Sequence, residues 1–269
     1  MKMVAAARLR RAEERAQASR PYAERLKSFL DSFTIDPTNI PHPLAEVRHT
    51  IHHRGLLIIT SDRGLCGSYN SNILREAGKW LKPLEKDQVK LYIVGNKGNA
   101  YFKHRNANIA KHFGNLDQKL DYKEIKNIAD TIANDFTNGV IDELDILYSQ
   151  FVSPAVCRQI TMHLLPIRAT KEETKGTEKK EMLADFIYEP SPEAILNILF
   201  PKFLYTRIVA SLADSFASEQ GQRMVAMTTA TDNAEEMVKD LTLKYNKARQ
   251  AAITKELGEI VGGAEALEK

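Results

Sequence analysis

The sequence predicts an α/β fold with long helices. The N- and C-terminal helices form an antiparallel two-helix coiled coil, and a mostly parallel, Rossmann-like α/β domain is inserted between them. Three observations predict this architecture. Residues 1–30 are rich in good helix formers. Short apolar runs then alternate with helical segments, as in the βα units of a parallel sheet. No proline follows Pro201, so the rest of the chain can form one long helix.

The domain boundaries follow from these segments. We expect an N-terminal coiled-coil helix at 1–30, an α/β domain at 31–200 and a long C-terminal coiled-coil helix at 201–269. The first helix is strongly basic, because residues 1–27 carry eight basic and three acidic side chains, a net charge of +5. Two interpretations of this charge stay open: a solvated helix face, or a surface that meets an acidic partner or the carboxyl ends of other helices. Pro21 interrupts the helix and predicts a kink or a local break.

The middle of the chain contains the segments expected to build the sheet. Strands are predicted at 55–60, 89–94 and 144–152, with a further strand-like run at 159–166. Helices are predicted at 70–81, 99–105 and 122–136. The charged stretch 171–180 is expected to be a loop. Ser191 followed by Pro192 is typical of a helix N-cap with proline at the first helical position.

The C-terminal helix carries a regular stripe of small and apolar residues. These residues follow one another at alternating steps of three and four, which is typical of a coiled-coil seam: Met227, Ala230, Ala234, Met237, Leu241, Tyr245, Ala248 and Ala252. The N-terminal helix is the expected partner of this seam. A charge at Leu241 is therefore expected to loosen the paired helices.

Composition excludes several classes of protein. The chain has 269 residues, of which 43% are hydrophobic and 27% charged, values that exclude a wholly disordered or collagen-like chain. The net charge of +3 is too small to indicate a nucleic-acid partner. No apolar run approaches the roughly 18 residues of a membrane helix, so we expect membrane association only through partners. Two cysteines and no signal peptide favour a reduced, intracellular setting.

Motifs for chemistry are missing from the sequence. It contains no phosphate-binding loop of the G-x-x-x-x-G-K-[ST] type, and its histidines show no metal-ligand spacing. Gly64 and Gly67 lie between a predicted strand and a predicted helix, where they favour a tight turn over an anion site. We therefore expect no catalytic residue, no cofactor and no metal.

Several longer motifs resemble the gamma subunit of F-type, proton-translocating ATP synthases, over Met1 to about Leu267. The motifs that carry the resemblance are Met1-Lys-Met-Val-Ala-Ala-Ala-Arg-Leu-Arg-Arg11, Ser61-Asp-Arg-Gly-Leu-Cys-Gly67 with Asn70, Arg223-Met-Val-Ala-Met227, Ala230-Thr-Asp-Asn-Ala234, Tyr245-Asn-Lys-Ala-Arg-Gln250, Ile253-Thr-Lys-Glu-Leu257 and Glu259-Ile-Val-Gly-Gly263. Family members begin further upstream, so the first helix is expected to be truncated at its start.

The resemblance implies a central-stalk rotor subunit that is not itself catalytic. Its partners would be the alpha and beta subunits of the catalytic hexamer, the epsilon subunit and the membrane c-type ring. The rotor would transmit proton-driven rotation of that ring to the hexamer for ATP synthesis, and the α/β domain would be the foot of the stalk. The implied place is peripheral, on the cytoplasmic face of a bacterial inner membrane, or alternatively on the matrix face of the mitochondrial inner membrane.

The resemblance also implies contact residues. Those expected to meet the alpha or beta subunits are Met1, Lys2, Arg223, Arg249, Gln250, Thr254 and Glu256. The part of the foot near the membrane ring is expected at Tyr188, Glu189, Pro190, Ser191 and Pro192. Two other classes stay open: a self-associating coiled-coil tether, and an α/β enzyme that uses the Gly64–Gly67 turn for a phosphate ligand. Binding to an alpha–beta ring, self-association and nucleotide binding would distinguish the three.

Overall fold

The structure is a computed structural model that describes residues 1–31, 42–116, 120–168 and 191–267. It divides into two units, Met1–Val225 and Ala226–Lys269, which are described separately below. The predicted loop at 171–180 lies outside the described residues, as do Tyr188, Glu189 and Pro190.

The first unit is built on a five-stranded sheet in the order β3-β2-β1-β4-β5. The strands are β1 (Arg54–Ile59), β2 (Val89–Val94), β3 (Ile109–Phe113), β4 (Glu143–Phe151) and β5 (Cys157–Leu165). Strands β1 to β4 are parallel, and β5 pairs antiparallel with β4. The mostly parallel α/β sheet is therefore confirmed. Sequence analysis missed β3, whose Lys111 and His112 interrupt the apolar pattern of an edge strand.

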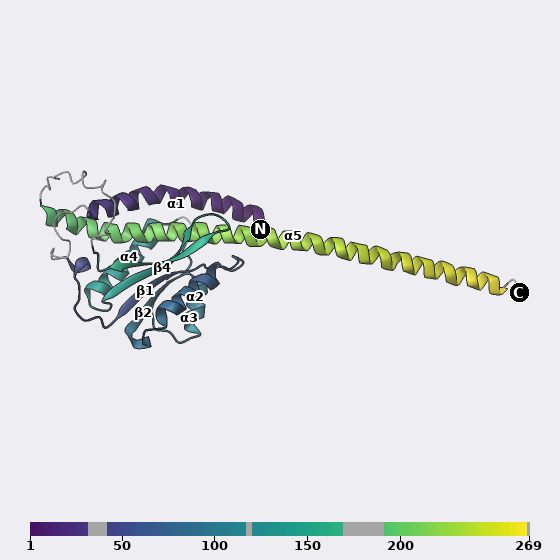
Figure 1. The fold of residues 1–269 in the computed structure, drawn as a ribbon, viewed down its shortest axis with the longest axis horizontal. Helices are drawn as coiled ribbons and strands as arrows, with labels where there is room; N and C mark the ends of the chain where they lie inside the picture. The colour runs from purple at the N-terminus through teal and green to yellow at the C-terminus, as the bar shows by residue number, and fades with distance from the viewer. Residues whose placement is uncertain (32–41, 117–119, 169–190, 268–269) are drawn as a thin grey trace, which may run out of the picture. The chain divides into compact units, whose positions relative to one another are not determined.

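Helices cover both faces of this sheet (Figure 1). One face packs against α2 (Tyr69–Leu81) and α3 (Asn96–Lys103), and the other packs against α4 (Tyr122–Thr137) and α5 (Pro192–Leu267). Side chains alternate along β1, so Leu56 and Ile58 face the first layer while Leu57 and Ile59 face the second. All four are fully buried because the central strand is covered on both sides.

The first helix, α1 (Lys2–Asp31), is continuous through Pro21, so the alternative of a local break is wrong. Proline removes one helical hydrogen bond, but packing on both sides of it holds the helix together. Ala16 and Ala23, which flank the proline, are both buried. Ala16 lies against Ala213 and Ala217 of α5.

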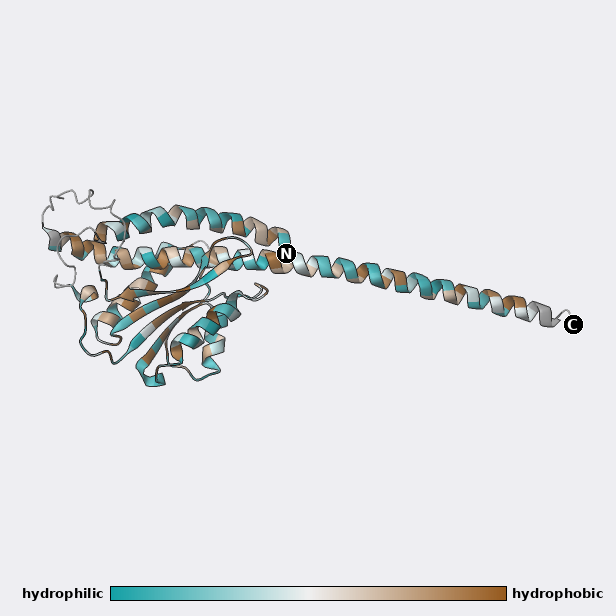
Figure 2. Cartoon of the chain, in the orientation of Figure 1, coloured by the Kyte–Doolittle hydropathy of each residue, from teal (hydrophilic) through white to brown (hydrophobic). Residues whose placement is uncertain are grey.

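The long helix α5 begins at Pro192, and Ser191 caps it. The Ser191 Oγ accepts a hydrogen bond from the Ala194 amide at 3.2 Å, as the sequence predicts. The helix continues through Pro201. In the first unit a buried apolar residue recurs at every fourth position, namely Leu196, Phe200, Leu204, Ile208, Leu212 and Phe216, and all residues from 211 to 221 are buried. These side chains pack α5 against the sheet, and Figure 2 shows the corresponding part of α5 with recurring brown, hydrophobic stretches.

The helices α1 and α5 run antiparallel within the first unit. Lys202 lies over the ring of Tyr22, and further along α5 Asp214 pairs with Arg20 and Ala217 lies against Ala16. The antiparallel helix pair is therefore confirmed. Within the first unit, the contacts of α1 with α5 lie around residues 202–219 of α5. Small alanines at the contact and the Arg20–Asp214 ion pair set this register.

The second unit is helical from Ala226 to Leu267. Its apolar seam is exposed: the side chains of Met237, Leu241 and Tyr245 are 66%, 62% and 66% exposed. The expectation that a charge at Leu241 loosens the α1–α5 pair is therefore wrong. By length and composition, α5 also contains a window apolar enough to cross a membrane, but one such helix is weak support, because the core helix of a soluble protein passes the same test.

Candidate partner-binding surfaces

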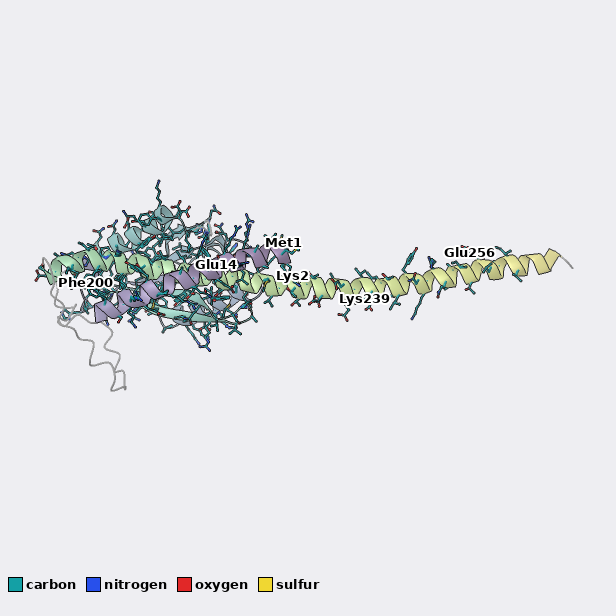
Figure 3. All side chains as sticks on the ribbon, turned by 90° about the horizontal axis from the view of Figure 1, so that it is seen from above. Met1, Lys2, Glu14, Phe200, Lys239 and Glu256 are labelled. Atoms are coloured by element: carbon teal, nitrogen blue, oxygen red, sulfur yellow. The ribbon has the colours of Figure 1, made fainter. Side chains whose placement is uncertain are left out.

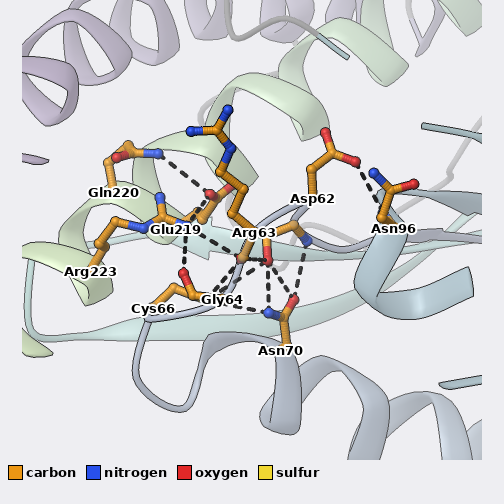
Figure 4. Close-up of polar contacts among 10 residues, drawn as sticks. Asp62, Arg63, Gly64, Cys66, Asn70, Asn96, Glu219, Gln220 and Arg223 are labelled. Carbon is orange, nitrogen blue, oxygen red and sulfur yellow. Dashed lines mark hydrogen bonds and ion pairs between the residues drawn. The ribbon is translucent and has the colours of Figure 1, made fainter. Parts of the chain in front are cut away.

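The loop between β1 and α2, residues 60–68, lies at the carboxyl edge of the sheet and is closed by its own hydrogen bonds (Figure 4). Asn70 Nδ2 donates to Ser61 Oγ at 2.7 Å, and the Ser61 amide donates to Asn70 Oδ1 at 3.1 Å. The Ser61 hydroxyl donates to the carbonyl of Arg63 at 2.7 Å. Leu65 and Gly67 both have positive φ, near 60° and 56°, which tightens the turn. The motif around Ser61 therefore specifies a rigid turn.

The same loop occupies the amino end of α3. Asp62 Oδ1 accepts the Asn96 amide at 3.0 Å, the Ser61 carbonyl accepts the Lys97 amide at 3.0 Å, and Thr60 Oγ1 accepts the Gly98 amide at 3.0 Å. A parallel α/β sheet offers such amides to anionic ligands at this edge. Here three consecutive amides are bonded within the chain. This geometry disfavours a phosphate site at the amino end of α3.

Glu219 and Arg223 of α5 form an ion pair against this loop, with 2.7 Å between Arg223 Nη2 and Glu219 Oε1. Arg223 Nη2 also donates to the carbonyl of Gly64 at 3.2 Å. Glu219 is only 5% exposed. Burial raises the pKa of its carboxyl group, and the neighbouring Arg223 guanidinium partly offsets that rise. The pair joins α5 to the loop that closes the amino end of α3.

A second polar contact joins α5 to the sheet. Ser215 Oγ accepts the Ser149 amide at 3.1 Å, and Ser218 Oγ donates to the Ser149 carbonyl at 3.0 Å. Ser149 belongs to β4, and all three residues are fully buried. Because buried backbone groups need partners, these hydroxyls hold α5 at one position along β4. Sequence analysis missed this contact, since serines inside a helix carry no distinctive motif.

The structure disperses the predicted contact residues. Met1 and Lys2 are exposed at the start of α1, and both are labelled in Figure 3. Arg223 is largely internal, with a side chain 14% exposed and bound to Glu219 and the loop. Its role toward a partner remains a prediction. Ser191 and Pro192 begin α5, where Ser191 serves as the N-cap.

The remaining predicted contacts lie together in the second unit. Arg249, Gln250, Thr254 and Glu256 are all exposed on α5, and Figure 3 labels Glu256. Thr254 Oγ1 donates to the Gln250 carbonyl one turn earlier, at 2.9 Å. These side chains are therefore available to a partner. That they bind one stays a prediction.

The second unit also exposes an unusual amount of apolar surface. Between residues 237 and 261, large hydrophobic side chains that are about half or more exposed are Met237, Val238, Leu241, Leu243, Tyr245, Ile253, Leu257, Ile260 and Val261. Apolar surface of this kind on a helix marks a binding surface for a partner. We call residues 237–261 the exposed apolar helix. Its signal in the sequence is the three-and-four spacing of the seam.

Fold and surfaces together define a class of protein in outline: an α/β domain joined to a pair of antiparallel helices, whose longer helix carries exposed apolar side chains. A family model described as ATP synthase matches residues 1–267, and the chain belongs to that family.

Relatives and solved structures agree with this assignment. The chain is 41% identical to the ATP synthase gamma chain of Chloroherpeton thalassium, over 100% of this chain and 92% of the relative. It is 42% identical to the ATP synthase gamma chain of Chlorobium phaeobacteroides, over 99% of this chain and 91% of the relative. Its fold resembles a central-stalk chain of the Tetrahymena thermophila mitochondrial ATP synthase, with a TM-score of 0.63, 23% identity, and 86% and 97% of the two chains covered. Its fold also resembles a chain of the Euglena gracilis mitochondrial ATP synthase, with a TM-score of 0.61 and 17% sequence identity, over 96% of this chain and 94% of that chain.

Proposed function

We propose that this chain is the rotating gamma subunit in the central stalk of an F-type ATP synthase. It transmits proton-driven rotation of the membrane c-type ring to the catalytic alpha–beta hexamer. The observation that carries the proposal is the exposed apolar helix at 237–261, continuous in α5 with residues anchored in the α/β domain. The gamma-chain relatives at 41–42% identity support it.

A rotor needs a helix that cannot turn relative to its base, and α5 meets this need in the first unit. Arg20 and Asp214 join α5 to α1, and Ser149 joins it to β4. Arg223 joins it to the β1–α2 loop. Three directional contacts on different sides of one helix resist rotation and sliding better than apolar packing alone, because hydrogen bonds are specific in direction.

The partners in this proposal are the alpha and beta subunits around the exposed apolar helix, and the epsilon subunit and c-type ring at the foot. The chain would be peripheral, attached to the cytoplasmic face of a bacterial inner membrane through those partners. It would not catalyse nucleotide chemistry itself. The occupied amides of Asn96, Lys97 and Gly98 support that part of the proposal.

The test is co-expression with alpha and beta subunits, followed by size-exclusion chromatography and an ATPase assay of the eluted peak. We expect one copy of the chain to co-elute with an ATP-hydrolysing hexamer. Leu241→Asp combined with Ile260→Asp should weaken co-elution, because both apolar side chains are exposed for a partner. Asp240→Asn, an exposed polar neighbour, is the matched control and should co-elute normally. A chain that elutes alone as a self-associated species would contradict the proposal and favour a tether.

A further inference from the structure

A pocket of about 480 Å³ lies within the first unit. Its walls come from α1, the β1–α2 loop, the segment after β3, and α5. The lining residues are Arg8, Arg11, Ala12, Arg15, Asp62, Arg63, Asn115, Leu116, Phe216, Glu219 and Arg223. Its volume falls in the range of small-molecule sites, roughly 300–1,000 Å³.

The lining is strongly basic. It holds five arginines against two acids. Arg8, Arg11 and Arg15 are spaced by three and four, so α1 presents them on one face. Mutual repulsion of these positive charges lowers the stability of the folded chain, and a bound anion would relieve that repulsion.

The two acids of the pocket are already engaged. Asp62 accepts the backbone amides of Asn96 and Asn115, at 3.0 and 3.2 Å. Glu219 is paired with Arg223. Even when both carboxylates are ionised, they offset only two of the five positive charges in the lining.

At least three guanidinium groups of the pocket keep unused donors. Within the part of the chain that the structure describes, the side chains of Arg8, Arg11 and Arg63 have no hydrogen bond or ion pair. Arg8 acts on Glu219 only through its charge, which partly offsets the rise in the pKa of that carboxyl group caused by burial. In Figure 4 the Arg63 guanidinium points away from the hydrogen bonds of its own loop. All three residues are exposed at the pocket wall.

We propose that this pocket binds a small phosphate-bearing anion with two or more phosphate groups. Planar guanidinium groups bind phosphate oxygens in pairs, and several of them around one cavity match a polyvalent anion better than a single carboxylate. Ala12, Leu116 and Phe216 supply an apolar wall beside these guanidinium groups. The bound anion would link α1 to the β1–α2 loop and to α5. The proposal does not depend on the rotor function.

The shared chemistry is the diphosphate group, which comes either from inorganic pyrophosphate or from a nucleotide such as ADP. Isothermal titration of the full chain with each compound distinguishes these sources. We expect saturable binding of pyrophosphate and a rise in melting temperature with its concentration, because a ligand of the folded state stabilises it. Tighter binding of ADP than of pyrophosphate would identify a nucleotide, and equal binding would identify the inorganic anion; both support the proposal.

Matched variants separate a built pocket from diffuse attraction. Arg11→Gln and Arg63→Gln should each weaken pyrophosphate binding by about tenfold, since each removes one charge-assisted contact. Arg10→Gln is the control, because Arg10 lies next to Arg11 on α1 and is not a lining residue. Absence of saturable binding at millimolar pyrophosphate would overturn the proposal. Equal weakening by Arg10→Gln, or tighter binding of a poly-glutamate peptide than of pyrophosphate, would overturn it as well.

Discussion

The guanidinium of Arg20 on α1 lies 2.6 Å from the carboxylate of Asp214 on α5, although the two residues are 194 positions apart in the chain. The same nitrogen donates to the carbonyl of Phe151 at 2.9 Å. One arginine therefore connects α1, α5 and the end of β4. Burial raises the pKa of Asp214, and Arg20 partly offsets that rise. The pair sets the register in which α1 lies along α5.

Removal of the Arg20 side chain should destabilise the first unit. Arg20→Ala leaves the largely buried Asp214 carboxylate without its partner, so we expect a loss of about 2 kcal/mol in the free energy of unfolding. Urea denaturation measures it. Arg10→Ala removes the exposed Arg10–Glu14 pair instead and should cost less than about 0.5 kcal/mol. Equal denaturation midpoints for both variants would show that the Arg20 pair adds no stability.

The serine contact between α5 and β4 predicts a second loss. Ser215→Ala leaves the buried amide of Ser149 without its acceptor, which should cost about 1–3 kcal/mol. Thr242→Ala is the matched control, because its exposed hydroxyl bonds only to the Val238 carbonyl of its own helix. Thermal denaturation followed by circular dichroism compares the two. If Ser215→Ala melts like Thr242→Ala, the hydroxyl does not hold α5 to the strand.

The buried Glu219 predicts a specific pH dependence. Its pKa is raised in the folded state, mainly by burial, so the folded chain holds this proton more tightly than the unfolded chain. The stabilisation from the neutral carboxyl is complete below the unfolded pKa and is lost as pH rises through the folded pKa. Glu219→Gln removes this titration. The stability of the unmodified chain relative to Glu219→Gln should therefore fall as the pH rises above about 4, the pKa of an unfolded glutamate. Denaturation at several pH values measures it, and a constant difference would contradict the prediction.

Asp142 should show the opposite sign. Burial raises its pKa, but Arg48 and the amides of His53 and His52 more than offset this, so the net pKa is lowered. Its contribution is present above the unfolded pKa and is lost as pH falls through the folded pKa. Asp142→Asn should therefore flatten the loss of stability in acid below about pH 4, as followed by tryptophan fluorescence. If Asp142→Asn loses stability in acid as steeply as the unmodified chain, the Asp142 carboxylate does not cause that loss.

Two leucines of α5 should respond differently to substitution. Leu212 is fully buried, so Leu212→Ala should cost about 2–5 kcal/mol. Leu241 is 62% exposed, so Leu241→Asp should leave the melting temperature of the isolated chain unchanged. Differential scanning calorimetry compares them. A drop for Leu241→Asp similar to that for Leu212→Ala would mean that Leu241 is packed within the chain.

Several elements could be predicted because their signals are local. The apolar run of β1 is bounded by glycine, and the Ser191–Pro192 pair marks the start of α5. β3 was missed because an edge strand is only partly buried and tolerates Lys111 and His112. The antiparallel β5 also had a local signal. The connection from Phe151 to Cys157 is too short for a parallel crossover, which needs about ten residues or more.

The interaction surfaces were predictable in kind but not in detail. The spacing from Met227 to Ala252 correctly indicates an apolar stripe on α5, yet it does not show what covers that stripe. The buried residues of α1 are Ala5, Leu9, Ala16, Ala23, Leu26 and Leu30, and Ala16 lies against Ala213 and Ala217 of α5. The inward role of Arg223 had no local signal, since an arginine on a helix is exposed in most contexts.

Local patterns in the sequence were sufficient to predict the α/β class, the pair of long helices and most element positions, because hydrophobic period, glycine, proline and caps act over a few residues. The register of α1 on α5, the closure of the β1–α2 loop over the α3 amides and the gathering of arginines at one pocket became visible only in the folded structure. Those features depend on contacts such as Arg20–Asp214 and Arg223–Gly64, between residues more than 150 positions apart. Such contacts form only when the whole chain has folded, so no local pattern specifies them.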